Sequence, residues 1–179
     1  MSRRKTFNTP GHAHFLTFSC WQRQPFLLDH EACLIFLQSL AEARARERFT
    51  VWAYVLMPEH VHLLIRPLSE IYQMATILRR IKEPVSWHVL AAWRRDHPGR
   101  LAAATDTTAA PVGHRFWQPG GGFDRNLYSP DIIRHTIAYI EGNPVRRRLV
   151  SSPLEWEWSS ARARSEHAAV PFKVDELTM

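Results

Sequence analysis

Two histidines, His60 and His62, stand two residues apart in an apolar run, and this spacing is the first sign of chemistry in the chain. Residues 51–65 predict two strands joined by a turn at 57–59, with both histidines on the second strand. Side chains alternate between the faces of a strand, so both imidazoles leave one face while Val61 points to the core. Two imidazoles placed in this way can bind one divalent metal ion. The plainer alternative is a pair of strand histidines that hydrogen-bond to backbone.

Tyr139 and Asn143 form a second group of side chains that could do chemistry. They lie near the end of a predicted helix that starts with Ser129 and Pro130 and ends near 142–144. Residues four apart share a helix face, so a phenolic oxygen and an amide oxygen can reach one point. The apolar residues of this helix should dock it on the sheet. Taken alone, Tyr139 is more simply a half-buried helix tyrosine, and Asn143 a helix C-terminal residue before proline.

The elements that must position these residues follow from periodicity and from the places of proline and glycine. A first strand is predicted over 12–21, and an amphipathic helix over 30–48. Residues 69–96 should form a helix in two pieces, because Pro84 breaks a helix interior but can open a new helix. Residues 97–113 are expected to form a mobile insertion. His12 and His14 repeat the histidine spacing in the first strand, but no later residue completes a ligand set there, and a half-exposed strand end is the favoured interpretation.

The length and composition indicate one globular domain. The chain has 179 residues, 45% of them hydrophobic and 22% charged. We predict a single domain over 1–179, with a core at about 12–150 and a C-terminal extension over 151–179. Two cysteines form no disulfide framework, and no apolar run is long enough to cross a membrane. These features favour a cytoplasmic protein without a membrane partner.

The basic character of the chain fits a polyanionic partner. The net charge is +6 and the isoelectric point is about 9.9. Three consecutive arginines, Arg146, Arg147 and Arg148, directly follow the Tyr139 helix and are predicted to contact phosphates, as is Arg125. A solvated basic loop is the alternative. Four tryptophans could stack on unpaired bases, although most tryptophans lie in cores: Trp52, Trp117, Trp156 and Trp158.

Four motifs in this order resemble those of the REP-associated tyrosine transposases, which belong to the single-tyrosine HUH transposases of the insertion-sequence type. They are MPEHVHLLI, FWQPGGGFDRNL, AYIEGNPVRRRLV and WEWSSARAR, and the resemblance covers roughly residues 12–164. It implies a ferredoxin-like α+β fold, an antiparallel sheet with helices packed on one face. It also implies a nuclease that cuts and rejoins single-stranded DNA near hairpins of REP-like repeats.

The resemblance gives roles to individual residues. His60 and His62 match the metal-binding pair, and Tyr139 matches the nucleophile. Asn143 matches a position where related enzymes carry a glutamine ligand, and the shorter asparagine shortens the reach. Attack by Tyr139 would leave a 5′-phosphotyrosine and a free 3′-hydroxyl. Mg²⁺ or Mn²⁺ is the expected ion, because two imidazoles and an amide oxygen leave positions open for phosphate oxygens. Insertion-sequence relatives are dimers that exchange the tyrosine helix, whereas REP-associated members resemble monomers, and we expect a monomer.

Two other classes of protein stay open at this point. A metal-dependent hydrolase could use His60 and His62 with water as the nucleophile, and it would need no Tyr139. A domesticated, non-catalytic DNA-binding protein could keep the fold, although the intact Tyr139 and both histidines argue against it.

Overall fold

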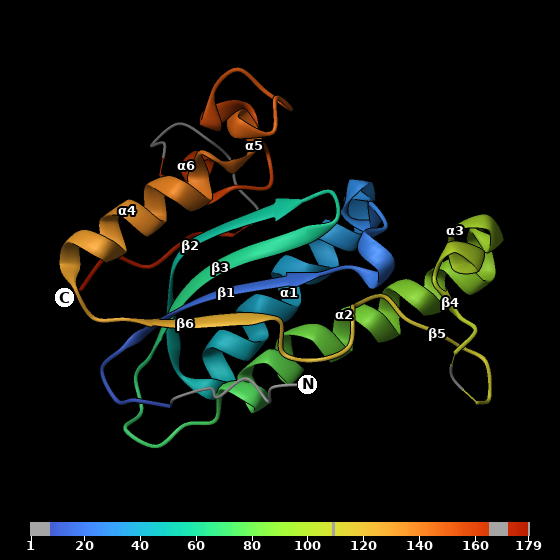
Figure 1. Cartoon of the computed structure of the whole chain (residues 1–179), viewed down its shortest axis with the longest axis horizontal. Helices are drawn as coiled ribbons and strands as arrows, with labels where there is room; N and C mark the ends of the chain where they lie inside the picture. The colour runs from blue at the N-terminus through green and yellow to red at the C-terminus, as the bar shows by residue number, and fades with distance from the viewer. Residues whose placement is uncertain (1–7, 109, 165–171, 179) are drawn as a thin grey trace.

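Four strands form one antiparallel sheet in the order β2, β3, β1, β6 (Figure 1). The computed structural model describes residues 8–108, 110–164 and 172–178. The strands are β1 (Ala13–Ser19), β2 (Phe49–Met57), β3 (His60–Pro67) and β6 (Phe123–Leu127). Helix α1 (His30–Glu47) connects β1 to β2, and helix α2 (Met74–Asp96) lies between β3 and β6 in the chain. This order of strands and helices is the ferredoxin-like arrangement, so the predicted α+β fold is confirmed.

Helices α1 and α2 cover one face of the sheet, as expected (Figure 1). The side chains of alternate strand residues fill the space between them, including Leu16, Phe18, Val61 and Leu63. Val61 is fully buried in this core, as the alternation between the two histidines predicts.

The predicted break at Pro84 is wrong. Helix α2 runs without interruption from Met74 to Asp96 and contains Pro84 in its interior. A proline there removes a backbone hydrogen bond and costs about 3 kcal/mol. The buried side of α2 outweighs this cost, because fully burying one large apolar side chain contributes about 1.5–3 kcal/mol. The helix buries several such side chains on both sides of the proline: Ile77, Ile81, Val85, Val89 and Trp93.

The opposite face of the sheet carries helix α4 (Pro130–Glu141), which contacts β2 and β3 (Figure 1). Its buried residues Ile133 and Ile140 join a second apolar cluster with Val55 and Leu64 of the sheet. The docking of this helix on the sheet is therefore confirmed. A single turn, α5 (Asn143–Arg146), follows directly.

Residues 97–113 contain helix α3 (Pro98–Ala103) and the first strand of a small ribbon. This ribbon pairs β4 (Thr105–Asp106) with β5 (Gly113–His114). Arg100 makes an ion pair with Asp29, which precedes α1, and so ties the segment to the body of the protein. The expected mobility of this segment stays a prediction.

Two described stretches near the C-terminus, one at Trp158 and one at Asp175, pair with the outer edge of β2. The amide of Leu56 donates to the Trp158 carbonyl over 2.9 Å, and the amide of Asp175 donates to the Val51 carbonyl over 2.9 Å. Pairing of this kind protects an exposed sheet edge. The remaining short helices are η1 (Trp21–Arg23), η2 (Phe26–Leu28), η3 (Pro153–Glu155) and α6 (Ser160–Ala163). Among the described residues, none of the helices has the length and hydropathy needed to span a bilayer.

Candidate active site

The two histidines lie at the start of β3 and face α4. In the ladder with β1, His60 pairs with Ser19 and His62 pairs with Thr17. Both imidazoles are more than nine-tenths buried, and their Nε2 atoms lie 3.1 Å apart. The prediction that both rings leave one face of the sheet is confirmed.

The other nitrogen of each ring is held by a neighbouring side chain. His60 Nδ1 lies 3.1 Å from Glu59 Oε1, and His62 Nδ1 lies 2.7 Å from Thr17 Oγ1. A carboxylate can only accept, so His60 Nδ1 carries the proton in this contact and its Nε2 is left with a lone pair. If His62 likewise donates to Thr17, the two lone pairs face each other at 3.1 Å. This is the arrangement by which metal-binding histidines are oriented, and a cation between them would remove the repulsion.

Burial keeps both rings neutral. Burial lowers the pKa of His62 to about 3, and the nearby His60 and Arg146 add to this effect. Burial also lowers the pKa of His60, although Glu59 works in the opposite direction. Neutral imidazole is the form that can bind a metal ion, and both rings have this form near pH 7.

The donor set fits a divalent ion with open coordination positions. Two metal–nitrogen bonds of about 2.1 Å that meet at a right angle separate the nitrogens by about 3.0 Å, close to the 3.1 Å between the two Nε2 atoms. Within the described ranges, no three His, Cys, Asp or Glu residues are grouped so that they could hold a metal ion. A structural zinc centre with four such ligands is therefore not indicated in these ranges, and the expected Mg²⁺ or Mn²⁺ stays a prediction.

Tyr139 and Asn143 reach the same hollow as the histidines. Tyr139 is 45% exposed at the end of α4, and Asn143 is buried at the start of α5. The Tyr139 ring lies 5.6 Å from the His62 ring between centroids. The hollow has a volume of about 360 Å³ and is lined by Thr17, Ser19, Arg23, His60, His62, Tyr139, Asn143, Arg146 and Arg147. The sequence-predicted metal and tyrosine residues therefore surround one space.

The predicted phosphate-binding arginines are divided between this hollow and its surroundings. The Arg146 guanidinium carbon lies 4.3 Å from the Tyr139 ring centroid, and the guanidinium also donates to the Tyr139 carbonyl. Arg147 lines the hollow as well. Arg148 is exposed outside its lining, and Arg125 is exposed on β6. Two of the four arginines are thus placed beside the tyrosine, and phosphate contact stays a prediction for all four.

Glu59 connects His60 to two arginines. Its Oε1 accepts from Arg23 over 3.1 Å and from Arg147 over 2.9 Å, besides its contact with His60. Burial opposes ionisation of Glu59, but the hydrogen bond and the charge of Arg147, together with the contact from His60, outweigh it and lower the pKa of Glu59 below its ordinary value. Sequence reasoning gave no role to Thr17 or Arg23. Thr17 could have been suggested only by the strand pairing, because it lies 45 residues from His62.

Several sequence candidates lie elsewhere. His14 is buried on the α2 side, where Nδ1 is 2.8 Å from Asp124 and Nε2 is 2.7 Å from the Tyr72 hydroxyl, so it has a structural role. The four tryptophans that could have stacked on bases are mostly buried. Trp52, Trp117 and Trp158 are buried, and Trp156 is half-buried with its indole N–H bonded to the Leu56 carbonyl. The three buried tryptophans are therefore part of the core, as the alternative interpretation held.

The architecture and the site can be compared with solved structures. A REP-associated tyrosine transposase bound to a REP hairpin is similar with a TM-score of 0.67 and 19% identity, covering 100% of this chain and 94% of that one. This chain has the fold of that transposase. A candidate transposase from Deinococcus radiodurans R1 matches with a TM-score of 0.47 and 18% identity, over 79% of this chain and 97% of that one, which is too low to support a conclusion. No family model matches the chain, and no curated protein does.

Proposed function

We propose that this chain is a REP-associated tyrosine transposase, a nuclease and strand transferase for single-stranded DNA at hairpin-forming repeats. The observation that carries the proposal is that Tyr139, His60, His62 and Asn143 line one open hollow. The fold shared with a REP-associated transposase supports it. The basic charge of the chain and the arginines beside Tyr139 suit a phosphodiester substrate.

In the proposed reaction the phenolic oxygen of Tyr139 attacks the scissile phosphorus. A bond forms between this oxygen and phosphorus, and the bond from phosphorus to the 3′ oxygen breaks. The phenol gives up its proton to solvent, and the departing 3′ oxygen takes one up. The product is a 5′-phosphotyrosine with a free 3′-hydroxyl, and because the phosphodiester is exchanged for another ester, a 3′-hydroxyl can reverse the step and join strands.

The side chains around the hollow bind and orient the phosphate. Arg146 packs on the ring of Tyr139 and restricts where its hydroxyl can point, while its guanidinium remains close enough to meet a phosphate oxygen. A phenol has a pKa of about 10, so it needs help near pH 7. Mg²⁺ or Mn²⁺ held by His60, His62 and the Asn143 amide oxygen would polarise the scissile phosphate and stabilise the developing charge.

The test is a covalent adduct at Tyr139. Incubation with single-stranded hairpin DNA and Mg²⁺ should yield a protein–DNA species that survives a denaturing gel, with phosphotyrosine at residue 139. Tyr139→Phe removes one hydroxyl and should abolish adduct and cleavage while hairpin binding persists. Tyr128→Phe is the matched control, because Tyr128 is exposed on the chain just before α4. It should cleave like the parent.

Other outcomes would point to other functions. Cleavage retained in Tyr139→Phe would favour a hydrolase that uses water. Hairpin binding without cleavage in the parent protein, with Mg²⁺ and with Mn²⁺, would favour a non-catalytic DNA-binding protein. The double variant His60→Ala/His62→Ala should bind hairpins but fail to cleave, and full cleavage by it would refute the metal assignment.

A further inference from the structure

The sheet face that holds the histidines continues as an aromatic and basic surface toward β6. In the antiparallel ladders, Thr17 pairs with His62 on one side and with Phe123 on the other. In the next row Phe15 pairs with Arg125 of β6. Directly paired residues point to the same face of a sheet, so Phe123, Phe15 and Arg125 lie on the face of the metal-binding pair.

The rings on this face form a continuous chain of contacts. The centroid of Phe15 lies 5.7 Å from that of Phe123, 5.6 Å from that of His62 and 6.0 Å from that of Tyr139. Phe123 is two strands away from His62 in its row, which is about 10 Å at the usual strand spacing. The surface therefore runs from Tyr139 to Phe123, which is far enough to reach the nucleotide next to the scissile phosphate.

Among the described residues, no helix covers this end of the face. Helix α4 covers the β2 and β3 side, whereas β6 forms the far edge of the sheet (Figure 1). Phe123 is 37% exposed, and the half-buried Phe15 packs against its ring. An aromatic side chain with that much exposure beside an open polar hollow is suited to receive a flat ring.

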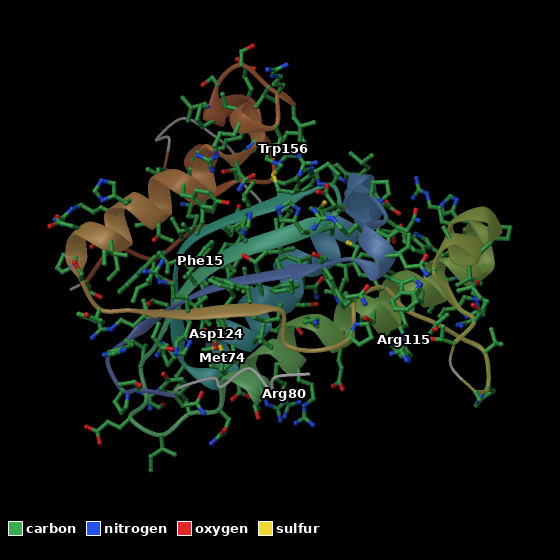
Figure 2. All side chains as sticks on the ribbon, in the orientation of Figure 1. Phe15, Met74, Arg80, Arg115, Asp124 and Trp156 are labelled. Atoms are coloured by element: carbon green, nitrogen blue, oxygen red, sulfur yellow. The ribbon has the colours of Figure 1, made fainter. Side chains whose placement is uncertain are left out.

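The charge of this surface is complementary to phosphate. Arg125 is exposed next to the two phenylalanines, and Arg146 lies at the Tyr139 end. The acidic residues that are closest in the chain are bound elsewhere. Asp124 points to the opposite face, where it contacts His14, and Figure 2 shows it on the α2 side of β6 while Phe15 lies on the α4 side of β1. Asp131 pairs with Arg134 in the first turn of α4.

The triple-glycine turn holds β6 against β1 at this place. Gly122 precedes Phe123 and has a φ of +74°, and a Cβ there would lie 2.2 Å from the carbonyl oxygen of Thr17. Only glycine allows this approach. The close approach fixes where the Phe123 ring stands relative to Thr17 and His62.

We propose that Phe123, supported by Phe15, is a stacking platform for an unpaired base next to the scissile phosphate, and that Arg125 contacts the DNA backbone beside it. The inference rests on the proposed function, because it takes single-stranded DNA as the ligand. Base–aromatic stacking tolerates any base, since every base has a π-face. The platform therefore binds the unpaired strand without reading its sequence.

The experiment separates stacking from phosphate contact with two probes. One is fluorescein-labelled oligothymidine, and the other is a chain of the same length made only of abasic sugar phosphates. Fluorescence anisotropy in EDTA reports binding without cleavage. Phe123→Leu should weaken binding of oligothymidine by roughly 5- to 100-fold and leave the abasic chain unchanged, because only the first probe has bases to stack. Arg125→Ala should weaken both probes alike.

The variants Phe123→Tyr and Phe123→Trp keep a ring and should retain the affinity for oligothymidine. Trp87→Leu is the matched control, since Trp87 is 71% exposed on α2 beside a hollow of about 740 Å³ on the other side of the sheet. It should bind both probes like the parent. Equal weakening of both probes by Phe123→Leu, or no weakening of either, would overturn the platform, as would a failure of the parent to bind oligothymidine.

The covalent adduct with hairpin DNA in Mg²⁺ is measured separately and tests the proposed function. If the parent forms the adduct and Phe123→Leu binds oligothymidine normally, the proposed transposase function is supported and the stacking platform is refuted. If Phe123→Leu loses only oligothymidine binding and the parent forms no adduct, the stacking platform is supported and the nuclease function is refuted.

Discussion

Replacing Glu59 should weaken metal binding even though Glu59 is not predicted to touch the metal. Its carboxylate is buried and accepts from His60 Nδ1 over 3.1 Å, which fixes the ring so that Nε2 points toward His62. Loss of such an orienting partner typically costs 10- to 100-fold in metal affinity, or about 1.4–2.8 kcal/mol. Arg23 and Arg147 also contact Glu59, but their side chains are 65% and 48% exposed, so each of these ion pairs contributes at most about 1 kcal/mol.

The assay is calorimetric titration of the protein with Mn²⁺. Glu59→Ala should lower the affinity by about 100-fold and Glu59→Gln by about 10-fold, because the amide oxygen can still accept from His60 without the negative charge. Glu141→Gln is the matched control, since Glu141 accepts hydrogen bonds from Ser160 and Arg164 over 2.8 Å each and does not line the hollow that contains the histidines. A Glu59→Ala protein that binds Mn²⁺ within twofold of the parent would refute the reasoning and leave Glu59 as a partner of the arginines alone.

Two further predictions concern charge. Replacing Arg146, Arg147 and Arg148 with alanine should weaken DNA binding for all sequences alike and flatten the slope of log K against log salt by up to about three units; an unchanged slope would mean that these arginines do not touch phosphate. In EDTA, His62 should make the free energy of unfolding decrease as the pH falls below about 6.5. His62 then binds a proton in the unfolded chain but stays neutral in the folded protein, where its pKa is about 3. Between pH 7 and pH 5 the loss is about 2 kcal/mol, and urea unfolding should show a smaller loss for His62→Gln, whereas an identical loss would contradict the low pKa.

The parts of the site that follow from local pattern could be predicted from the sequence. The two-residue spacing of His60 and His62 on a predicted strand placed both on one face, because a strand has a period of two. The four-residue spacing placed Tyr139 and Asn143 on one side of their helix, and both line the hollow although α4 ends at Glu141 and a new turn begins at Asn143. The two side chains keep their common side across the end of α4 because the chain continues in a helical turn.

The parts that depend on distant contacts could not be predicted in this way. Glu59 lies 36 residues from Arg23 and 88 from Arg147, and no local pattern brings these three together. The platform residues Phe15 and Phe123 meet only because β1 lies between β3 and β6. The predicted helix break at Pro84 was wrong for a related reason. The free-energy cost of a proline inside a helix is local, whereas the packing of α2 that offsets it depends on distant residues.

Tyr139, the proposed nucleophile, and the two histidines should act within one chain. Helix α4 buries Ile133 and Ile140 on the sheet of its own chain, and Arg147 just beyond it is bonded to Glu59 beside His60. Only residues 128–129 connect β6 to α4, and a chain extends by at most about 3.6 Å per residue, so α4 could enter another copy only if that copy lay against the β6 edge.

Mixing two inactive variants tests this. Tyr139→Phe has intact histidines, and His60→Ala/His62→Ala has an intact tyrosine, so exchange of helices between copies would rebuild one complete site in each mixed pair. We expect no covalent adduct with hairpin DNA from the mixture, at concentrations where the parent protein forms it readily. The parent diluted into the Tyr139→Phe protein is the control, and it should keep its adduct in proportion to its amount. An adduct that appears only on mixing the two variants would show that the tyrosine helix is exchanged and that the active site belongs to a dimer.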